Sequence, residues 1–254
     1  MSDAPSTRDL TQDGEPSPSS PPPKPASWWE DYIDIFYAPS EVFARREQSG
    51  FGVPMLVVTL LLGVLFLAVS GVLQPVFDAE MQRGMAAQMK NNPQLTPEML
   101  EKGRAIGMTF QKIGAFIFTP ITLFLLGLTI WLVGKLFDSK QTLSAAIMVA
   151  CYAYLPKVID LVLGGVQGLI LDPATMNGRF RLSLGLGRFF DPDAASPMLL
   201  ALIGRIDVFT IWVTVLLAIG LSVSGKIPRQ KAYIAAVLIW IIGALPTVLQ
   251  AMRS

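Results

Sequence analysis

The stretch Phe51–Phe77 reads FGVPMLVVTLLLGVLFLAVSGVLQPVF and contains no charged residue. A helix needs about 20 consecutive apolar residues to cross the hydrocarbon core of a bilayer, and this stretch is longer than that. A single span in lipid must satisfy its backbone hydrogen bonds internally. The stretch is therefore predicted to be a transmembrane α-helix.

Four further apolar runs follow, and together they predict an all-α, polytopic membrane protein with about five transmembrane helices. A β-barrel would show alternating segments of about 10 residues instead. The third run contains Pro156 and two charges, so it forms either one bent helix or two segments that meet near Leu155 and Pro156. The predicted spans are residues 52–77, 114–136, 143–171, 200–222 and 232–250.

The composition excludes several kinds of function. Of the 254 residues, 52% are hydrophobic and only 15% are charged, whereas a soluble domain has about 25% charged residues. The chain has no histidine, which removes histidine-based catalysis and histidine-bound metals. Its single cysteine, Cys151, allows no internal disulfide. We expect no enzyme activity, no cofactor and no metal, and the net charge of +1 gives no reason to expect nucleic acid binding.

Two segments precede the spans. Residues 1–26 are rich in Pro and Ser and are predicted to be a disordered cytoplasmic tail. The tail is either a docking peptide for a protein domain or a spacer, and we favour the spacer. Residues 27–50 are predicted to form interfacial amphipathic helices, the second capped by Ser40. These helices lie either on lipid or against the bundle. Their apolar positions recur at helical spacing: Trp28, Trp29, Tyr32, Ile33 and Phe36.

Two long links join the spans on one side of the membrane. Residues 78–113 are predicted to form a helical hairpin, with a stripe of methionines at Met81, Met85 and Met89. The stripe either packs on the neighbouring helix, which we favour, or offers an adaptable binding surface. Residues 179–186 alternate between polar and apolar residues, a period of two that predicts a short strand or an extended segment.

The distribution of basic residues in the short links predicts the orientation. The link between the fourth and fifth spans contains Lys226, Arg229 and Lys231, and Arg45 and Arg46 precede the first span. Because such residues favour the cytoplasmic side, the N-terminus is predicted to be cytoplasmic and the C-terminus outside.

Three charged residues fall within the apolar runs: Lys157, Asp160 and Asp207. A charge in the membrane is costly unless it is paired, so each is a candidate functional residue. Lys157 and Asp160 are three residues apart on one helix, and Asp207 is placed about ten residues into the fourth span, within reach of Lys157. The group is either a polar path for an ion, proton or lipid headgroup, or a structural ion pair, which we favour.

Three stretches carry a resemblance to bacterial Yip1-domain proteins: APSEVF (38–43), TLSAAIMVACYAYLPKVI (142–159) and the segment 206–242. The resemblance implies that residues 51–251 form a Yip1-like five-helix transmembrane domain in the bacterial inner membrane, with a cytoplasmic N-terminus. The positions that match the family pattern are Pro39, Phe43, Tyr152, Pro156, Asp207, Trp212 and Gly220.

The sequence supports three hypotheses of function. The favoured one is a non-enzymatic membrane scaffold or adaptor, whose partners are membrane lipids and a cytoplasmic protein that contacts residues 1–47. The alternative is a channel- or transporter-like protein that uses Lys157, Asp160 and Asp207. The third is membrane shaping by residues 28–47.

Overall fold

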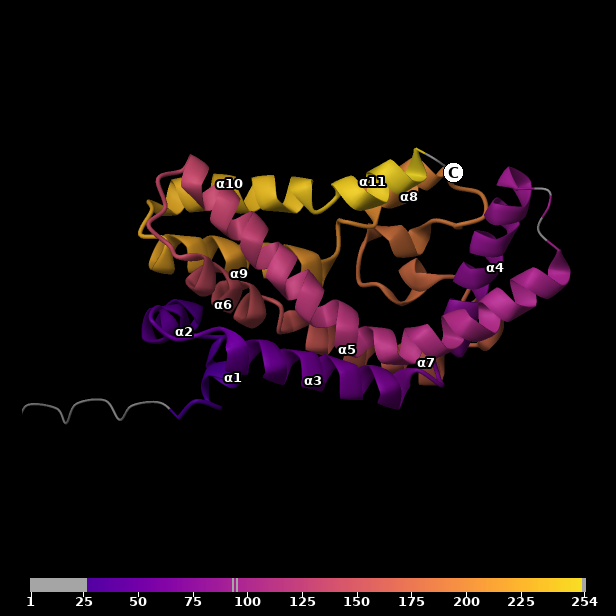
Figure 1. Cartoon of the computed structure of the whole chain (residues 1–254), viewed down its shortest axis with the longest axis horizontal. Coiled ribbons are helices and arrows are strands. Elements are labelled where there is room, and N and C mark those ends of the chain that lie inside the picture. The colour runs from indigo at the N-terminus through magenta and orange to yellow at the C-terminus, as the bar shows by residue number, and fades with distance from the viewer. Residues whose placement is uncertain (1–26, 93, 95, 253–254) are drawn as a thin grey trace, which may run out of the picture.

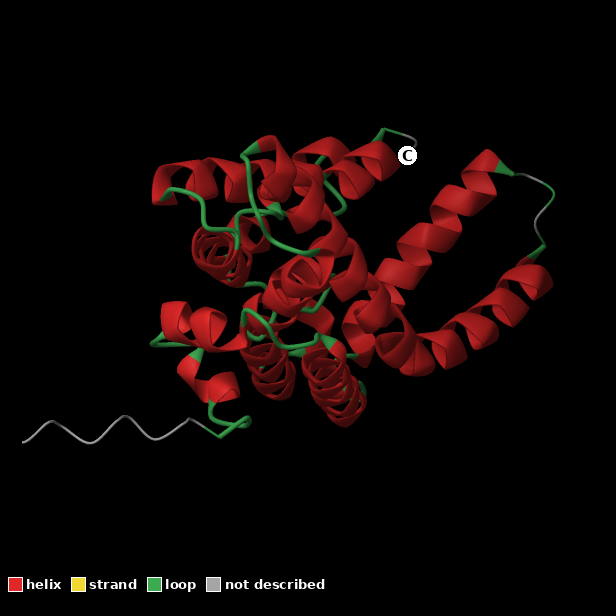
Figure 2. Ribbon diagram, turned by 60° about the vertical axis from the view of Figure 1, so that its left-hand side comes forward, coloured by secondary structure: helices red, strands yellow, loops and turns green. Residues whose placement is uncertain are grey.

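The computed structural model describes residues 27–92, 94 and 96–252, so the predicted disordered tail (1–26) lies outside the described residues. Helices dominate this part of the chain (Figures 1 and 2). The α-helices are α1 (Asp31–Asp34), α2 (Pro39–Arg46), α3 (Gly52–Val69), α4 (Gln74–Asn91), α5 (Pro97–Leu136), α6 (Leu143–Ala153), α7 (Pro156–Ile170), α8 (Pro197–Ile203), α9 (Val208–Ser224), α10 (Arg229–Ile242) and α11 (Leu245–Ala251). Three short 3₁₀ helices lie between α7 and α8: η1 (Pro173–Thr175), η2 (Arg179–Leu182) and η3 (Leu186–Phe189).

Four helical segments are long and apolar enough to cross a membrane. They are α3, the second part of α5 (Ile113–Leu136), α6 with α7, and α10 with α11. A fifth apolar helix, α9, has 17 residues and is therefore about 26 Å long. The prediction of a polytopic helical membrane protein is confirmed, and the five apolar segments follow one another in the predicted order.

The links between these segments gather at two ends of the bundle (Figure 1). One end, which we name the α2 end, holds α1, α2 and the links 137–142 and 225–228. Lys226 Nζ lies 2.8 Å from Glu47 Oε1 there, and the backbone N–H of Lys140 donates to the carbonyl of Gly225 at 3.1 Å. The opposite end, the α4 end, holds α4, the 3₁₀ helices, α8 and the C-terminal end of the described chain.

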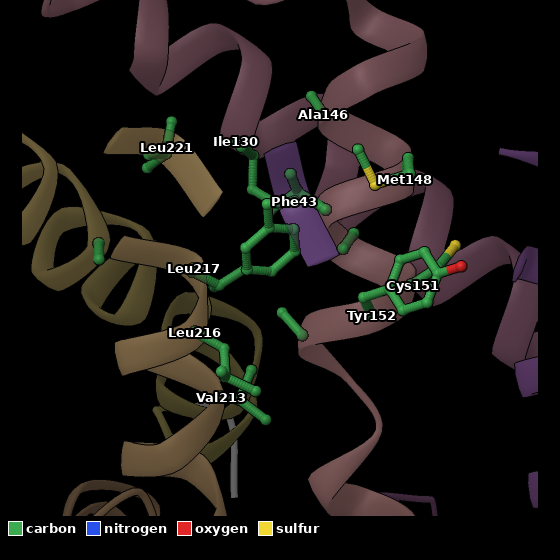
Figure 3. Close-up of a cluster of buried hydrophobic side chains, with 14 of the residues drawn as sticks. Phe43, Ile130, Ala146, Met148, Cys151, Tyr152, Val213, Leu216, Leu217 and Leu221 are labelled. Carbon is green, nitrogen blue, oxygen red and sulfur yellow. The ribbon is translucent and has the colours of Figure 1, made fainter. Parts of the chain in front are cut away.

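The segment α6 with α7 is the centre of the bundle. Within it 56% of the span is buried, against 22% in each of the other three long spans. Every residue from Ala145 to Ala153 is buried. The side chains of α6, α9 and α2 meet around Phe43 in the core (Figure 3). The outer helices turn apolar side chains such as Leu56 and Val64 outward, as lipid contact requires.

Two glycines allow the neighbouring helices to approach α6 closely. A Cβ atom at Gly127 of α5 would lie 2.6 Å from Ile147 Cα. A Cβ atom at Gly220 of α9 would likewise overlap the side chain of Val149. Small residues at helix contacts are typical of membrane bundles, because van der Waals packing replaces the hydrophobic drive there.

The central span is broken into two helices between Ala153 and Pro156. Proline lacks a backbone N–H and tolerates only the start of a helix, so α7 begins at Pro156. Both α3 and α9 pack against α6 and also against α7, so the two pieces follow one another through the bundle. Residues 143–170 are therefore a single span with a break in it.

The fourth predicted span differs from the expected continuous helix over 200–222. Helix α8 ends at Ile203, and α9 begins only at Val208. Asp207 was expected about ten residues into this helix, but it caps the N-terminus of α9 instead. The reason is chemical: its carboxylate accepts hydrogen bonds from backbone N–H groups of α9, as Asp does at helix starts.

Residues 179–186 do not form the short strand that was one of the two alternatives, and the extended backbone of the other alternative occurs only between the 3₁₀ helices, at Ser183 and Gly185. This segment forms η2, a turn, and the start of η3, with one isolated bridge between Gly185 and Asp207. Gly178 has a φ of +159°, at the edge of the region that favours glycine, and it lets the chain turn into η2. The alternation of polar and apolar residues reflects one face packed on the bundle, because Phe180 contacts Gly204 and Gly187.

Helices α1 and α2 pack against the bundle, which was one of the two alternatives for residues 27–50. Ile35, Val42 and Phe43 are fully buried. Helix α1 has only four residues, and α2 begins at Pro39 with Ala38 in the cap position, where Ser40 was expected. Three of the exposed side chains of this unit are aromatic: Trp28, Trp29 and Tyr37.

The predicted hairpin after the first span is present as α4 and the first part of α5, which project from the bundle as an arm (Figure 2). Thr96 caps α5 by accepting a hydrogen bond from the Met99 N–H at 3.3 Å. Met81 and Met85 line the groove between the two helices, whereas Met89 is 49% exposed. Of the three methionines, Met81 approaches α5, where a Cβ atom at Gly107 would lie 3.5 Å from its Cε.

Candidate functional site

Lys157 lies in the first turn of α7, directly after the break in the central span. Its Nζ atom is 2.9 Å from Asp160 Oδ2 and 3.7 Å from Asp207 Oδ1. It also donates a hydrogen bond to Thr210 Oγ1 at 3.4 Å. The structure thus brings together all three charged residues that the sequence pointed to, and Lys157 joins α7 to α9.

Asp207 is held on both carboxylate oxygens. Oδ1 accepts from the N–H groups of Phe209 (3.0 Å) and Thr210 (3.1 Å) at the start of α9. Oδ2 accepts from Ser183 Oγ at 3.1 Å. The negative charge also faces the positive end of the helix dipole, and the side chain is buried. These contacts compensate for the burial of the carboxylate.

The link between η2 and η3 closes over this charge cluster. Leu186 N–H donates to the carbonyl of Ile206 at 3.0 Å, and Gly185 N–H donates to Ser183 Oγ at 2.9 Å. A Cβ atom at Gly185 would lie 2.5 Å from that carbonyl oxygen, so only glycine fits there. Gln167 of α7 fixes the other side of the link by donating to the carbonyl of Leu182 at 2.8 Å.

A cavity of about 560 Å³ lies beside the cluster, with walls from α3, α4, α5, α7, α8, α9, α11 and η2. Its apolar lining comes from several of these elements, with residues such as Leu62 and Phe66 of α3, Phe77 of α4 and Leu161 of α7. Its polar lining is dominated by charge and hydroxyl groups: Thr119, Tyr154, Lys157, Asp160, Arg179, Ser183, Arg205, Asp207, Thr210 and Thr247.

Two cavity-lining arginines were not among the predicted site residues. Arg205 follows α8; its Nη2 donates to the Trp240 carbonyl at 3.0 Å, and its guanidinium lies 5.8 Å from the centre of the Trp240 ring. Arg179 lies in η2, with its guanidinium 4.9 Å from the centre of the Phe180 ring. An arginine inside the apolar run 198–222 was a signal for Arg205. Nothing in the sequence pointed to Arg179, because η2 reaches the cavity only through the fold.

The length of α9 gives the depth of the cavity in a membrane whose hydrocarbon core begins at the α2 end. Helix α9 ends at the α2 end, so Asp207 at its start is about 26 Å along the bundle from that end. The hydrocarbon core of a bilayer is about 30 Å thick. The charge cluster therefore lies close to the boundary of the leaflet that faces the α4 end.

A second group of charges anchors α1 and α2 at the α2 end. Asp31 is fully buried and accepts from Arg45 Nη2 at 2.6 Å and from Arg46 Nε. Arg45 Nη2 also lies 2.5 Å from Asp34 Oδ2. Because both oxygens of Asp31 meet a guanidinium, this buried charge is neutralised within the unit.

Aromatic contacts complete the docking of α1. The Tyr32 and Tyr152 rings are 5.3 Å apart, and the Phe36 and Trp212 rings are 5.6 Å apart. Tyr152 and Trp212 belong to α6 and α9, so α1 docks on both of these helices.

The positions that match the family pattern have three kinds of role: docking of α1 and α2, packing in the centre of the bundle, and lining of the cavity. Pro39 starts α2 and Pro156 starts α7, Phe43 and Tyr152 are buried in the core, Trp212 contacts Phe36, Gly220 contacts Val149, and Asp207 lines the cavity.

These features define a multi-pass α-helical membrane protein with a charged cavity at membrane depth. The chain belongs to the Yip1 domain family, whose model matches residues 33–249. It is 22% identical over 209 residues to a protein of Bacillus subtilis (strain 168) described as membrane protein YknW, covering 81% of this chain and 83% of that one. No solved structure matches the chain.

Proposed function

We propose that this protein is a non-enzymatic scaffold or adaptor of the bacterial inner membrane, which presents α1 and α2 to a protein partner in the cytoplasm. The observation that carries the proposal is the surface of this unit. Although it is anchored through buried groups, it exposes four large side chains by more than half: Trp28, Trp29, Ile33 and Tyr37. Exposed Trp and Tyr on a rigid support are typical anchors of protein interfaces.

The charge of the unit favours a protein partner over the membrane surface. Residues 27–50 contain five acidic residues and two arginines. Anionic lipids give the cytoplasmic leaflet a negative surface potential, which repels an acidic segment. Glu41 has 73% of its side chain exposed, so part of this negative charge faces outward.

The cytoplasmic position of the α2 end is part of the proposal. The two short links at this end contain Lys140 and Lys226, and Arg229 directly follows the second link, as expected for cytoplasmic links. Cysteine labelling tests this orientation, because the single native cysteine is buried. A membrane-impermeant maleimide should label Ala174→Cys in intact spheroplasts, but Glu41→Cys only after lysis; the reverse pattern would contradict the proposed orientation.

Purification in a gentle detergent, followed by mass spectrometry of bound proteins, tests the adaptor function. The test variant is Trp29→Ala/Ile33→Ala, which removes two exposed side chains one helical turn apart. The matched control is Leu186→Ala/Phe189→Ala, which removes two exposed side chains at the α4 end. A variant lacking residues 1–26 reports separately on the tail.

We expect a protein that is recovered in stoichiometric amount with the wild type and the control, but is lost from the test variant. If no protein is recovered, or if the test variant retains it equally, the adaptor proposal fails. Loss from the variant lacking residues 1–26 alone would place the contact in the tail.

The alternative function, transport through Lys157, Asp160 and Asp207, is less well supported by the geometry. Lys157 contacts both carboxylates, and Asp207 has further donors on both oxygens. Groups held in this way favour a structural role over a path for moving ions. Flux in proteoliposomes that disappears when the three residues are neutralised would support transport over the adaptor function.

A further inference from the structure

The charges that line the cavity are unequal. Lys157 is paired with Asp160 and Asp207, and these account for both of the lining carboxylates. Arg179 and Arg205 also line the cavity, and neither has an ion-pair partner in the part of the chain that the structure describes. Three basic and two acidic side chains therefore line the cavity, which gives a net charge of +1, and the two guanidinium groups are the cations without a carboxylate partner.

Arg205 has unused capacity to donate hydrogen bonds. Its Nη2 donates to the Trp240 carbonyl, while its Nε is buried and has no hydrogen-bond partner among the described residues. A guanidinium has five N–H donors and fits the geometry of phosphate and carboxylate oxygens. The buried Nε is out of reach of a ligand in the cavity, but Nη1 is not buried and has no hydrogen-bond acceptor among the described residues, so it can donate to an anionic oxygen there.

The walls of the cavity indicate what the rest of the ligand resembles. Leu62 and Phe66 of α3 and Leu161 of α7 give it an apolar side, and its volume of about 560 Å³ is within the usual range of ligand pockets. The arginines lie near the boundary of the leaflet that faces the α4 end, which is the depth of lipid headgroups. An amphiphile with an anionic head therefore fits better than a small hydrophilic solute.

We infer that this cavity binds the phosphate-bearing headgroup of an anionic membrane lipid, with Arg205 and Arg179 at the phosphate and the acyl chains against the wall formed by α3 and α7. The same phosphate chemistry could be supplied by free phosphate, which the experiment separates. The site is at the opposite end of the bundle from α1 and α2, so it is independent of the adaptor proposal.

Native mass spectrometry of the purified full-length protein, after removal of bound lipid, tests the inference. The protein is titrated with phosphatidylglycerol and, separately, with diacylglycerol that has the same acyl chains but no phosphate. Inorganic phosphate is then added as a competitor at millimolar concentration. We expect phosphatidylglycerol to bind, diacylglycerol to bind far more weakly, and inorganic phosphate to leave the lipid bound.

Two variants test the site by different means. Arg205→Gln removes one guanidinium, and because a charge-assisted hydrogen bond contributes at least as much as a tenfold change in affinity, we expect binding to weaken by about tenfold or more. Gly164→Leu keeps every charge and fills the cavity, because a Cβ atom at Gly164 meets nothing within 4 Å. We expect it to lose binding as well.

Each variant has a matched control. Arg188→Gln removes an arginine of the same link that does not line this cavity. Gly84→Leu adds the same side chain at an open position on α4. Both should bind phosphatidylglycerol like the wild type, and size-exclusion profiles should show that all four variants are folded.

The remaining outcomes overturn the inference. If Arg205→Gln and Gly164→Leu are folded and bind the lipid like the wild type, the cavity is not the site. If diacylglycerol binds as tightly as phosphatidylglycerol, the phosphate is not recognised. If inorganic phosphate alone displaces the lipid completely, the ligand is a free phosphate compound and the lipid assignment is wrong. If Gly164→Leu alone does not fold, Arg205→Gln decides the question: unchanged lipid binding in this variant overturns the inference, whereas weaker binding that Arg205→Lys partly restores supports it.

Discussion

The α2 end and the cavity both bury a carboxylate beside basic side chains, but they differ in how the charges are matched. Asp31 meets Arg45 and Arg46 in a network in which each arginine has a carboxylate partner. At the cavity, Asp207 is equally well satisfied, yet two further arginines have no carboxylate partner among the described residues. A matched network serves to hold two elements together, whereas an excess of charge beside a cavity provides a place for a ligand.

The largest expected effect is at the matched network. Asp31→Ala should leave Arg45 and Arg46 without their buried partner, and breaking a buried ion pair costs about 3–5 kcal/mol. We expect a large loss of thermal stability, measured as the temperature at which the folded peak disappears in size-exclusion chromatography. Undocking of α1 and α2 should accompany it.

Glu41→Ala is the control for this prediction. Glu41 Oε2 lies 3.9 Å from Arg45 Nη1 and is largely exposed, so its removal should change stability by less than about 1 kcal/mol. Equal losses of thermal stability in Asp31→Ala and Glu41→Ala would show that burial of the ion pair does not matter. The Asp31 network would then not differ from the cavity in the way described above.

A second prediction compares a glycine in the packed core with a glycine at the cavity. Gly220→Ala should push α9 away from Val149 of α6, and overpacking of this kind costs about 1–3 kcal/mol. Gly164→Ala should be neutral or slightly stabilising, because alanine favours helix over glycine and the position is open. Thermal melting of the two variants measures the difference.

The double variant Gly220→Ala/Val149→Ala checks the cause of the first effect. If overlap with Val149 is responsible, removal of that side chain should restore part of the lost stability. No recovery in the double variant would mean that α9 tolerates the alanine poorly for another reason.

The third prediction concerns the cap of α9. Asp207→Ala removes the acceptor for the N–H groups of Phe209 and Thr210, and loss of an N-cap costs about 0.5–2 kcal/mol. Asp207→Ser keeps a cap but removes the charge, so it should recover most of this stability. Thermal melting separates the two contributions.

If Asp207→Ser is as unstable as Asp207→Ala, the contact with Lys157 outweighs the cap. Asp207 would then stabilise the protein mainly through its ion pair with Lys157 and only slightly as the cap of α9. In that case the carboxylate at the cavity would resemble Asp31, which also acts through ion pairs.

The spans could be predicted from the sequence because a membrane crossing needs little more than length and apolar composition. The breaks could not be predicted equally well. The run over 200–222 is apolar enough to hide the turn at Gly204–Ile206, where Arg205 and Asp207 were the only local signs. The docking of α1 was not decided by its pattern either, because the partners of Asp31 are 14 and 15 residues away.

The candidate site was predicted in part for the same reason. Lys157 and Asp160 lie three residues apart on α7, so their pairing follows from helix geometry alone. Arg179 reaches the cavity because Phe180 packs on Gly204 and the link folds back over the bundle. A long-range contact of this kind leaves no periodic signal, and the alternating pattern of the segment wrongly indicated a strand.

The smallest expected effect is a pH dependence at two carboxyls, one at each end of the bundle. Hydrogen bonds from Tyr37 and Arg45 hold the pKa of Asp34 below its ordinary value of 3.8, and a hydrogen bond from Arg83 lowers the pKa of Asp193 in the same way. A carboxyl whose pKa is lower in the folded state stabilises the fold above about pH 4, and this contribution is lost as the pH falls through the folded-state pKa. Thermal melting between pH 7 and pH 3 should therefore show a shallow decrease in stability below pH 4.

Two variants test the origin of this decrease. Asp34→Asn should reduce it by removing the carboxyl in the α1–α2 unit, and Asp193→Asn should reduce it by removing the carboxyl that joins α4 to the link before α8. If the decrease is unchanged in both variants, the acid sensitivity has its origin in neither of these two contacts.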